Sequence, residues 1–545
     1  MSTTEPNPDI TGAGTARWLR FQIVECILVG LAGWLFYVNL HGDLPYHDVI
    51  RFAIQVEGDR YVWDIGHVLL QPTTLLWHRH LGFGQHPMYS QADLHAVTTA
   101  LALAIFHAIL LRLRFPPWQR IAGTILVATS CGIIILAPSG HIKMLTFPFV
   151  NAALYFAVDW EQRARNTRPG IDHALVLSGS LLGLAAAFLV SALAAAPFAA
   201  FAILGIMRRA GATWLRAFWV SGVFSTLCGS VFLFWVAFGL VHFADLPVNL
   251  SNVIASIEHK ADHNREIFFW SVRAARLVFG TANNLIAAQD FGPMVRAWLS
   301  GYEPSIPVTG WIVISQALPW TAAAILIATI YALACRAAWR GATCLMPLAW
   351  LLGATGWTVY YNLNDPEHWF QLTVPTVLLC LMLFSPSAKR IVVPVWLGLA
   401  LVLNVALLAV PQARYPLAKY RADVRAMLKP SDLVIAFGDY GGGAHFEFLN
   451  PGIAPLIMPD RVFMQTRSVD ALFQYLRREI DAGLQRGGTV YVFSILDPDN
   501  WQGAWDQIAG RGLTKARMFA FFRDYYRIES IGQVGEIPVW RLTAK

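Results

Sequence analysis

Residues 21–40, FQIVECILVGLAGWLFYVNL, decide the fold class of this chain. The run holds one charged residue, Glu25, and it is as long as the roughly 20 residues that a membrane-spanning helix needs. Arg17 and Arg20 precede it. It is too long for the core of a signal peptide, and no cleavage pattern follows it. The sequence therefore predicts the first membrane-spanning helix here.

The composition of the whole chain agrees with a membrane protein. Hydrophobic residues make up 56% of the 545 residues and charged residues only 14%, with a mean hydropathy of +0.48. A soluble protein of this length needs roughly a quarter of its residues charged. The net charge of +7 comes from arginines in short loops between apolar runs, so we read it as membrane topology and expect no nucleic-acid partner.

Apolar runs long enough to span a membrane recur along the chain. The long run over 172–207 must be divided, and we divide it near Ser191 and Pro197. This gives about eleven spans, at 19–40, 95–113, 120–137, 143–159, 172–188, 189–207, 215–242, 310–334, 343–361, 369–385 and 391–411.

Arginines occupy alternate loops between these runs. By the positive-inside rule these loops lie in the cytosol, and an odd number of spans then leaves the C-terminus outside. The sequence predicts an α-helical polytopic membrane protein with a C-terminal α/β extracytoplasmic domain. The boundaries are residues 1–411 for the transmembrane domain, with outside loops 41–94 and 243–309, and residues 412–545 for the C-terminal domain.

The C-terminal region has the pattern of a small α/β domain. Short strands are predicted at 433–437, 490–493 and 538–542, and helices at 468–484 and 500–509. The glycine-rich residues 438–443 match neither dinucleotide nor P-loop patterns, so a surface turn is favoured over a phosphate loop. No two of the six cysteines have CxxC spacing, so the sequence predicts no structural zinc site.

The first outside loop concentrates carboxylates and imidazoles. Residues 41–48 read HGDLPYHD, and Asp48 opens an amphipathic stretch at the expected water–lipid boundary. A partly desolvated carboxylate there can serve as a general base, which makes Asp48 the best candidate and Asp43 the alternative. Asp48 is also a typical helix N-cap, and the two roles are compatible.

Further polar residues follow on the same side of the membrane. Asp64 and His67 have helical i, i+3 spacing and are candidates to bind a sugar hydroxyl or a phosphate; as metal ligands the pair is a weak set. His141 and Lys143, in the turn PSGHIK, are candidates to bind a lipid phosphate, although Lys143 could equally extend its amine to the interface.

Two more clusters complete the set of candidate substrate-binding residues. The turn before the tenth predicted span contains Asp365, Glu367 and His368, and the second long loop contains Lys260 and Arg265. A solvated surface is the alternative for the long loop. All these clusters fall on one face of the membrane, whereas a channel or transporter places ionisable groups in mid-span. This arrangement favours an enzyme working at the outer interface.

The pattern resembles the GT-C superfamily of membrane glycosyltransferases, which includes protein mannosyltransferases and lipid A aminoarabinose transferases. The resembling features are the early aspartate after the first span, residues 66–72 (GHVLLQP), and residues 365–375 (DPEHWFQLTVP), over roughly residues 15–410. The chain departs from the family in lacking adjacent acids after the first span. It also has His368 where many members have arginine.

The resemblance implies transfer of a sugar from a polyprenyl-phosphate donor to an acceptor hydroxyl, with inversion and without a metal. The acceptor is a lipid, a glycan or a protein, and membrane lipids surround the enzyme. Excess of arginine over lysine suggests a bacterial inner membrane with a periplasmic C-terminal domain. The alternatives are a transporter or flippase for a lipid-linked saccharide, a sensory or assembly protein that works through its C-terminal domain, and a ligase or polymerase of lipid-linked glycans.

Overall fold

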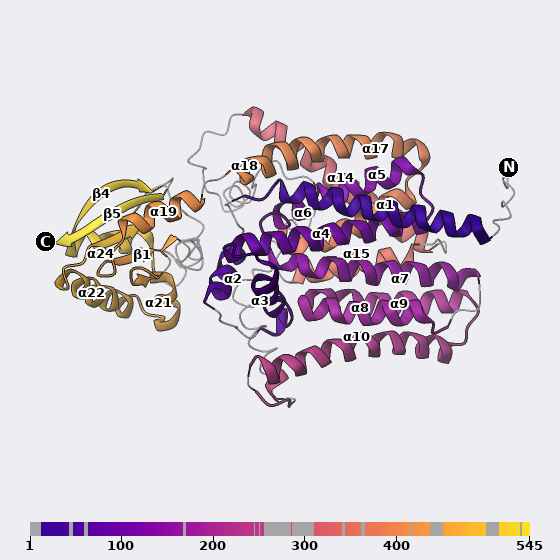
Figure 1. The fold of residues 1–545 in the computed structure, drawn as a ribbon, viewed down its shortest axis with the longest axis horizontal. Helices are drawn as coiled ribbons and strands as arrows, with labels where there is room; N and C mark the ends of the chain where they lie inside the picture. The colour runs from indigo at the N-terminus through magenta and orange to yellow at the C-terminus, as the bar shows by residue number, and fades with distance from the viewer. Residues whose placement is uncertain are drawn as a thin grey trace. The chain divides into compact units, whose positions relative to one another are not determined.

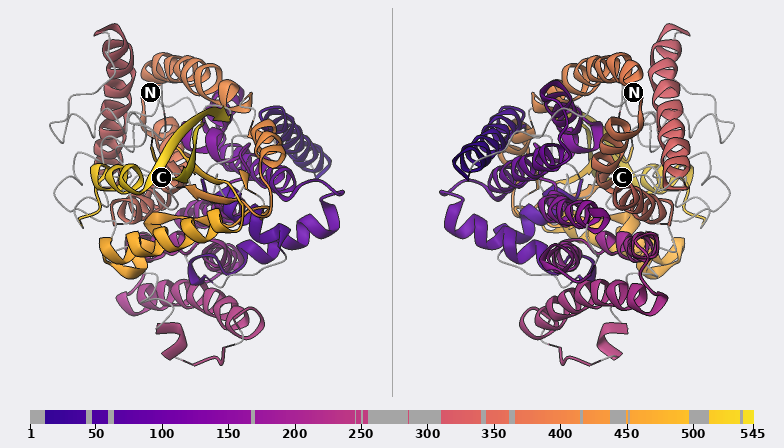
Figure 2. Two further views of the ribbon diagram at one scale, coloured as in Figure 1. Left: turned by 90° about the vertical axis from the view of Figure 1, so that its left-hand side faces the viewer. Right: turned by 90° about the vertical axis from the view of Figure 1, so that its right-hand side faces the viewer.

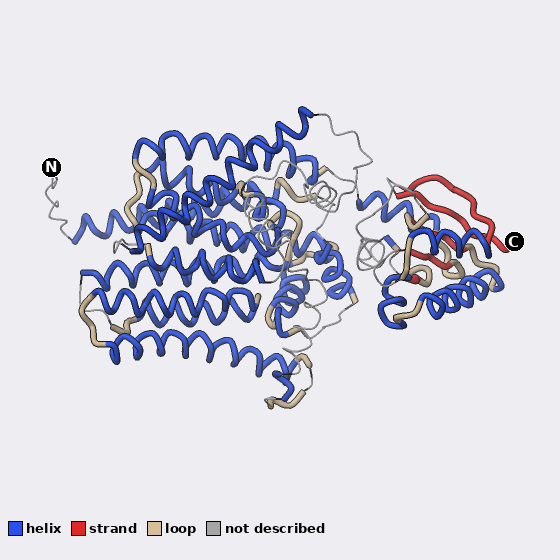
Figure 3. Tube along the Cα trace, turned by 180° about the vertical axis from the view of Figure 1, so that it is seen from behind, coloured by secondary structure: helices blue, strands red, loops and turns tan. Residues whose placement is uncertain are grey.

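The computed structural model describes the chain over most of its length. The described residues are 12–42, 47–58, 64–166, 170–244, 246–249, 251–254, 285, 310–339, 344–360, 366–414, 417–436, 449–450, 452–496, 512–534 and 537–545. They form two compact units, a helical unit (residues 1–41 and 59–413) and a C-terminal unit (residues 42–58 and 414–545). All described strands belong to the C-terminal unit (Figure 3).

The helical unit is a bundle of long helices that run side by side (Figures 1 and 2). Its first half contains α1 (Gly12–Val38), α3 (Leu70–Leu81), α4 (Pro87–Arg112), α5 (Pro117–Ala128), α6 (Cys131–Leu136), α7 (Phe147–Asn166), α8 (His173–Phe188), α9 (Ala195–Arg209) and α10 (Trp214–His242). Its second half contains α14 (Gly310–Trp339), α15 (Leu345–Tyr360), α16 (Pro366–Leu383), α17 (Pro386–Leu399) and α18 (Val410–Ala413).

The outer surface of this bundle is apolar, as a lipid-facing surface must be. Leu28 on α1, Phe201 on α9 and Leu215 on α10 are 60%, 71% and 82% exposed. Five described helices have the length and composition to cross a membrane, at Arg20–Val38, Pro87–Arg112, Val190–Arg209, Trp214–His242 and Pro386–Ala406, and three more apolar helices are shorter. The protein is therefore membrane-integral, while the predicted count of eleven spans is not confirmed.

Two boundary predictions can be compared directly with the helices. The predicted division of 172–207 is confirmed, because α8 ends at Phe188 and a 3₁₀ turn, η3 (Val190–Ala194), precedes α9. The predicted span over 120–137 is divided between two helices, because α5 ends at Ala128 and α6 begins at Cys131. There the Thr129 and Ser130 hydroxyls donate to the carbonyls of Ile125 and Val127, and such side-chain hydrogen bonds compete with the helix.

Glycines bring α8 against α10 at van der Waals distance. Gly179 and Gly183 have the small-xxx-small spacing that lets two membrane helices approach closely. A Cβ at Gly179 would lie 2.9 Å from the Phe224 carbonyl oxygen, and one at Gly183 would collide with the Cys228 carbonyl oxygen. The small side chain is therefore required at this interface.

A half-buried charged network joins the first helices. Glu25 on α1 accepts from His107 Nε2 on α4 at 2.9 Å and from both Nε and Nη2 of Arg120 on α5. The other His107 nitrogen, Nδ1, lies 2.9 Å from the Thr124 hydroxyl oxygen. Every ring nitrogen of His107 thus has a partner, which offsets the cost of placing it among apolar helices.

The C-terminal unit has a five-stranded sheet in the order β2-β1-β3-β5-β4. The strands are β1 (Leu433–Ala436), β2 (Leu456–Ile457), β3 (Val490–Phe493), β4 (Tyr526–Val534) and β5 (Ile537–Ala544), with helices α19 (Leu417–Met427), α21 (Pro459–Thr466), α22 (Val469–Gln485) and α24 (Lys515–Tyr525). β1 pairs in parallel with β2 and β3, and β5 runs antiparallel to β3 and β4.

The three predicted strands of this unit and the helix over 468–484 are confirmed, whereas β2 and β4 were not predicted. The predicted helix at 500–509 and the glycine-rich residues 438–443 lie outside the described residues. The unit also includes α2 (His47–Glu57), the predicted amphipathic helix, whose Glu57 carboxylate lies 3.4 Å from the Arg421 guanidinium on α19.

We expect Gly183→Leu to destabilise the helical unit by about 1–3 kcal/mol, because the new side chain separates α8 from α10. Thermal unfolding of the purified protein in detergent measures the change. Gly222→Leu on α10 is the matched control, since no atom lies within 4 Å of its Cβ position. Equal melting temperatures for the two variants would contradict the assigned interface.

Candidate functional site

Polar side chains gather inside one end of the helical unit. They come from the residue after α1, from α3, from the first turns of α4, and from the turn that leads through η2 (Ile142–Thr146) into α7. We call this set the polar cluster; it comprises His41, His78, Ser90, Gln91, His95, Thr99, His141, Lys143 and Thr146. These elements contact one another around the start of α4.

His95 holds the central position in the polar cluster. Its side chain is fully buried, and it interacts electrostatically with His141 and His41. Among the described residues neither of its ring nitrogens has a hydrogen-bond partner. Gln91 and Thr99 lie one helical turn before and after it, so the three share one face of α4.

Several neighbours of His95 are equally without partners in the described part of the chain. The buried atoms concerned include both amide atoms of Gln91 and the hydroxyls of Ser90, Thr99 and Thr146. Leaving one buried donor or acceptor unpaired costs about 1–3 kcal/mol. So many such groups at one place are typical of a site that binds a polar ligand.

Glycines fix the backbone around the polar cluster. Gly140 has φ +75°, and a Cβ there would lie 2.9 Å from the Ala92 backbone nitrogen, so its turn packs directly on α4. A Cβ at Gly82 would come within 3.0 Å of His78 Nδ1 and 2.9 Å of Ser90 Oγ. Both side chains therefore converge on the same point beside the end of α3.

The turn after Gly140 positions His141 and Lys143. The Lys143 backbone N–H donates to His141 Nδ1 at 3.4 Å, which leaves the proton of a neutral His141 ring on Nε2. The Lys143 side chain is only 3% exposed. A buried ammonium and a ring N–H so close in sequence can together bind an anion such as a phosphate.

His41 lies at the edge of the polar cluster. Its Nδ1 is 3.6 Å from the Asp93 carboxylate on α4. Burial lowers the pKa of the His41 imidazole, against the opposing effect of that carboxylate. The neutral form is therefore favoured, and a neutral imidazole can donate and accept hydrogen bonds at once.

The polar cluster lies at the opposite end of the bundle from the arginines. Ser90 and His95 are near the N-terminus of α4, whereas Arg112 at its C-terminus pairs with Asp159 on α7 at 2.5 Å. At 1.5 Å per residue, His95 and Arg112 are separated by roughly 25 Å along the helix. This distance is comparable with the apolar thickness of a bilayer.

Asp64 and His67 have local structural contacts. Asp64 caps the 3₁₀ turn η1 (Ile65–His67), where its carboxylate accepts from the Gly66 N–H at 2.7 Å. His67 Nδ1 is 3.4 Å from the Phe188 carbonyl oxygen at the end of α8. η1 contacts α8 and η3, and its Ile65 packs in an apolar cluster with α10. The predicted substrate role of Asp64 and His67 stays a prediction.

The remaining predicted site residues are described partly or not at all. Asp48 lies in the first turn of α2, and Glu367 and His368 lie in the first turn of α16, with only the backbone described. Outside the described residues lie the other candidates, Asp43, Lys260, Arg265 and Asp365. Their assigned roles stay predictions.

Sequence reasoning found two members of the polar cluster, His141 and Lys143, and missed its centre. The predicted span began at residue 95, whereas α4 begins at Pro87, with His86 accepting from the Met88 N–H at 3.2 Å. The signal that could have revealed the site is the spacing of Gln91, His95 and Thr99, which are four residues apart and therefore lie on one face of the helix.

The described residues contain no group of three His, Cys, Asp or Glu side chains placed to hold a metal ion. A described cluster built from imidazole, amide, hydroxyl and ammonium groups favours hydrogen bonding and anion binding. Metal independence itself stays a prediction.

Neither a protein-family model nor a curated protein matches this sequence. Two solved structures of ArnT from Cupriavidus metallidurans match it. The structure bound to undecaprenyl phosphate is 11% identical, covers 95% of this chain and 97% of ArnT, and has a TM-score of 0.48. The apo structure is 12% identical, covers 96% and 98%, and has a TM-score of 0.49.

TM-scores below 0.5 do not establish a shared fold. The function is therefore argued from the residues of this chain.

We expect His95→Phe to raise the stability of the helical unit by about 1–3 kcal/mol while it impairs function, because it removes two unpaired buried nitrogens. His107→Phe is the matched control on the same helix; its ring nitrogens are both partnered, so this variant should be less stable than the wild type. Thermal unfolding measures both. A destabilised His95→Phe protein would show that the ring is a structural element.

Proposed function

We propose that this protein is a membrane glycosyltransferase that moves a sugar from a polyprenyl-phosphate donor to an acceptor hydroxyl. The observation that supports this most directly is the polar cluster, a buried set of imidazoles, amides and hydroxyls beside Lys143 at one end of an apolar bundle. A lipid-linked sugar has the matching parts, because it joins an apolar tail, an anionic phosphate and a polyhydroxylated head.

The tail, the phosphate and the sugar of the donor would each bind a different part of the helical unit. The apolar outer surface of the bundle suits the polyprenyl tail, as it suits membrane lipids in general. The Lys143 ammonium and the His141 ring are the proposed phosphate ligands, with Lys260, Arg265 and His368 as further candidates. The unpaired groups on α4 would bind hydroxyls, since a hydroxyl both donates and accepts.

Asp48 is the proposed general base and Asp43 the alternative. The acceptor oxygen attacks the anomeric carbon from the side opposite the phosphate, and its proton passes to the carboxylate. The bond from the anomeric carbon to the phosphate oxygen breaks, and its electron pair leaves with polyprenyl phosphate. Attack from the opposite side inverts the anomeric configuration. The phosphate gains negative charge in this step, and donors already fixed in place stabilise it.

The proposal also specifies on which face of the membrane, and in which cellular compartment, the reaction takes place. The arginines at the far end of α4 and α7 are the cytosolic side by the positive-inside rule, which assigns the polar cluster to the outer face. We propose a bacterial inner membrane with the reaction and the C-terminal unit in the periplasm. The undecaprenyl phosphate in the ArnT structure is a carrier of the proposed class.

We expect Asp48→Asn to lower the rate of sugar transfer by a factor of about 100 or more, because the acceptor loses its general base. Transfer from a radiolabelled polyprenyl-phosphate sugar to an outer-membrane lipid or glycan fraction, measured in proteoliposomes, tests this. Asp43→Asn is the matched variant that separates the two candidate bases. Wild-type rates in both variants would exclude a base in this segment.

Lys143→Met should raise the dissociation constant for polyprenyl phosphate, because it removes the buried cation proposed to bind the phosphate. Lys389→Met is the control, since Lys389 lies on α17 at the arginine end of the bundle, near Phe115. Equal affinity in the two variants would argue against the phosphate assignment. Movement of the intact donor across the bilayer without transfer would favour the flippase alternative.

A further inference from the structure

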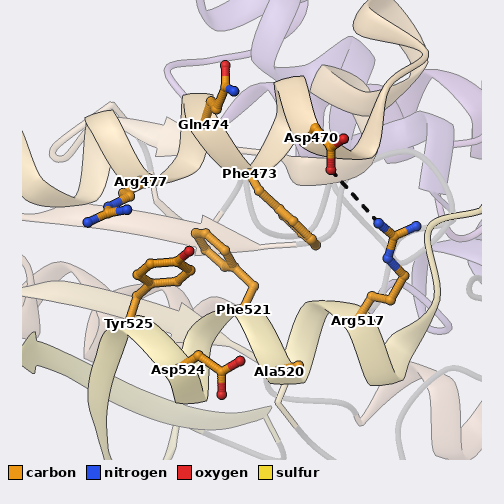
Figure 4. A pocket seen from close by; sticks show the side chains of 9 residues that line it. All are labelled: Asp470, Phe473, Gln474, Arg477, Arg517, Ala520, Phe521, Asp524 and Tyr525. Atoms are coloured by element: carbon orange, nitrogen blue, oxygen red, sulfur yellow. Dashed lines mark ion pairs between the residues drawn. The ribbon is translucent and has the colours of Figure 1, made fainter.

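The C-terminal unit carries a groove on its surface that the proposed transfer reaction does not use. It lies between α22 and α24 and has a volume of about 450 Å³ (Figure 4). Binding sites for small molecules commonly measure about 300–1,000 Å³. The residues that line it are Asp470, Phe473, Gln474, Arg477, Arg517, Ala520, Phe521, Asp524 and Tyr525.

The floor of the groove is aromatic. The rings of Phe473 and Phe521 stack with centroids 4.7 Å apart and planes 12° from parallel. Tyr525 extends this surface, with its centroid 5.5 Å from that of Phe521, and is 45% exposed. Phe521 is only 4% exposed and packs behind the other two rings, so Tyr525 is the ring that faces water and on which an apolar ligand face can pack.

Planar charged groups stand at both ends of this floor. At one end Arg517 on α24 lies 3.9 Å from Asp470 on α22, as the dashed line in Figure 4 marks. At the other end the Arg477 guanidinium lies over the Tyr525 ring, 4.5 Å from its centroid. Asp524 completes the set, so two acids and two bases surround the aromatic centre.

This balance of charge restricts the chemistry of a ligand. A phosphate would meet the two carboxylates, and a cation would meet the two guanidinium groups. A purely apolar chain would cover the aromatic centre but make no hydrogen bond to the charged rim. A neutral saccharide meets every requirement, because its hydroxyls both donate and accept while one face of the sugar ring presents C–H bonds to an aromatic surface.

We propose that the groove between α22 and α24 binds a neutral saccharide through its aromatic floor and its paired Arg and Asp side chains. The sugar ring lies against Tyr525 and the exposed edge of Phe473, and its hydroxyls bridge Arg477 and Arg517. The site is separate from the polar cluster. Its function does not depend on which donor the helical unit uses.

The test is glycan binding by the full-length protein in detergent. Fluorescently labelled protein is applied to an array of neutral hexose oligosaccharides, sulfated glycans and uronic-acid oligosaccharides, and hits are titrated by biolayer interferometry. We expect neutral oligosaccharides to be retained. The double variant Arg477→Ala and Arg517→Ala should weaken binding by about tenfold or more, as loss of charge-assisted hydrogen bonds predicts.

The double variant Arg478→Ala and Arg486→Ala is the matched control. It removes two exposed arginines, one on α22 and one at its C-cap, that do not line the groove, and it should leave the affinity unchanged. Tyr525→Ala tests the aromatic floor separately, and all variants should keep the wild-type melting temperature. The proposal is overturned if no neutral glycan binds, if only acidic glycans bind and both double variants lose them equally, or if the groove variants bind normally.

Discussion

A polar atom that is buried among apolar helices without a hydrogen-bond partner destabilises the fold, and the rest of this structure depends on that constraint. The helix α4 contains one histidine whose ring nitrogens have partners and one whose ring nitrogens have none among the described residues. Near its C-terminus His107 has a partner on each nitrogen, from Glu25 and Thr124, and the network ties α1, α4 and α5 together. Near its N-terminus His95 has none among the described residues. Selection for stability alone would remove such a residue, so its presence agrees with the ligand site that we propose.

Irregular backbone is concentrated at the same end of the bundle as the polar cluster. The break between α5 and α6, the 3₁₀ turns η2 and η3, and the π-helix η5 (Ala400–Ala409) interrupt helices there. Each is held by protein contacts: the Asn404 amide donates to the Thr129 carbonyl, and the Gln371 amide to the Ser191 hydroxyl, both at 2.8 Å. Non-helical backbone at membrane depth is tolerated only where protein or a water-filled site surrounds it. At the arginine end, by contrast, the described helices α4 and α9 continue regularly to Arg112 and Arg209.

The sequence predicted the helices and strands that a hydrophobic pattern specifies. It did not predict the features that depend on which residues are buried in the folded protein. The apolar runs and the strands β1, β3 and β5 were recognisable because hydrophobic pattern alone specifies them. The edge strand β4 was missed because its outward residues are almost all exposed and carry no alternation. Gln91 and His95 were passed over because a polar residue at the start of a span normally marks its boundary. Only the packing of Gly140 on Ala92 shows that they are enclosed.

The C-terminal unit is discontinuous in sequence. It is made of two segments, residues 42–58 and residues 414–545, and the chain between them belongs to the helical unit. The link is specific: Glu57 of α2 pairs with Arg421 of α19. A truncation before residue 414 would therefore strip an early segment of its folding partner as well as removing the tail. The early segment and the tail thus form one compact unit, and a cut between them would separate parts that contact each other.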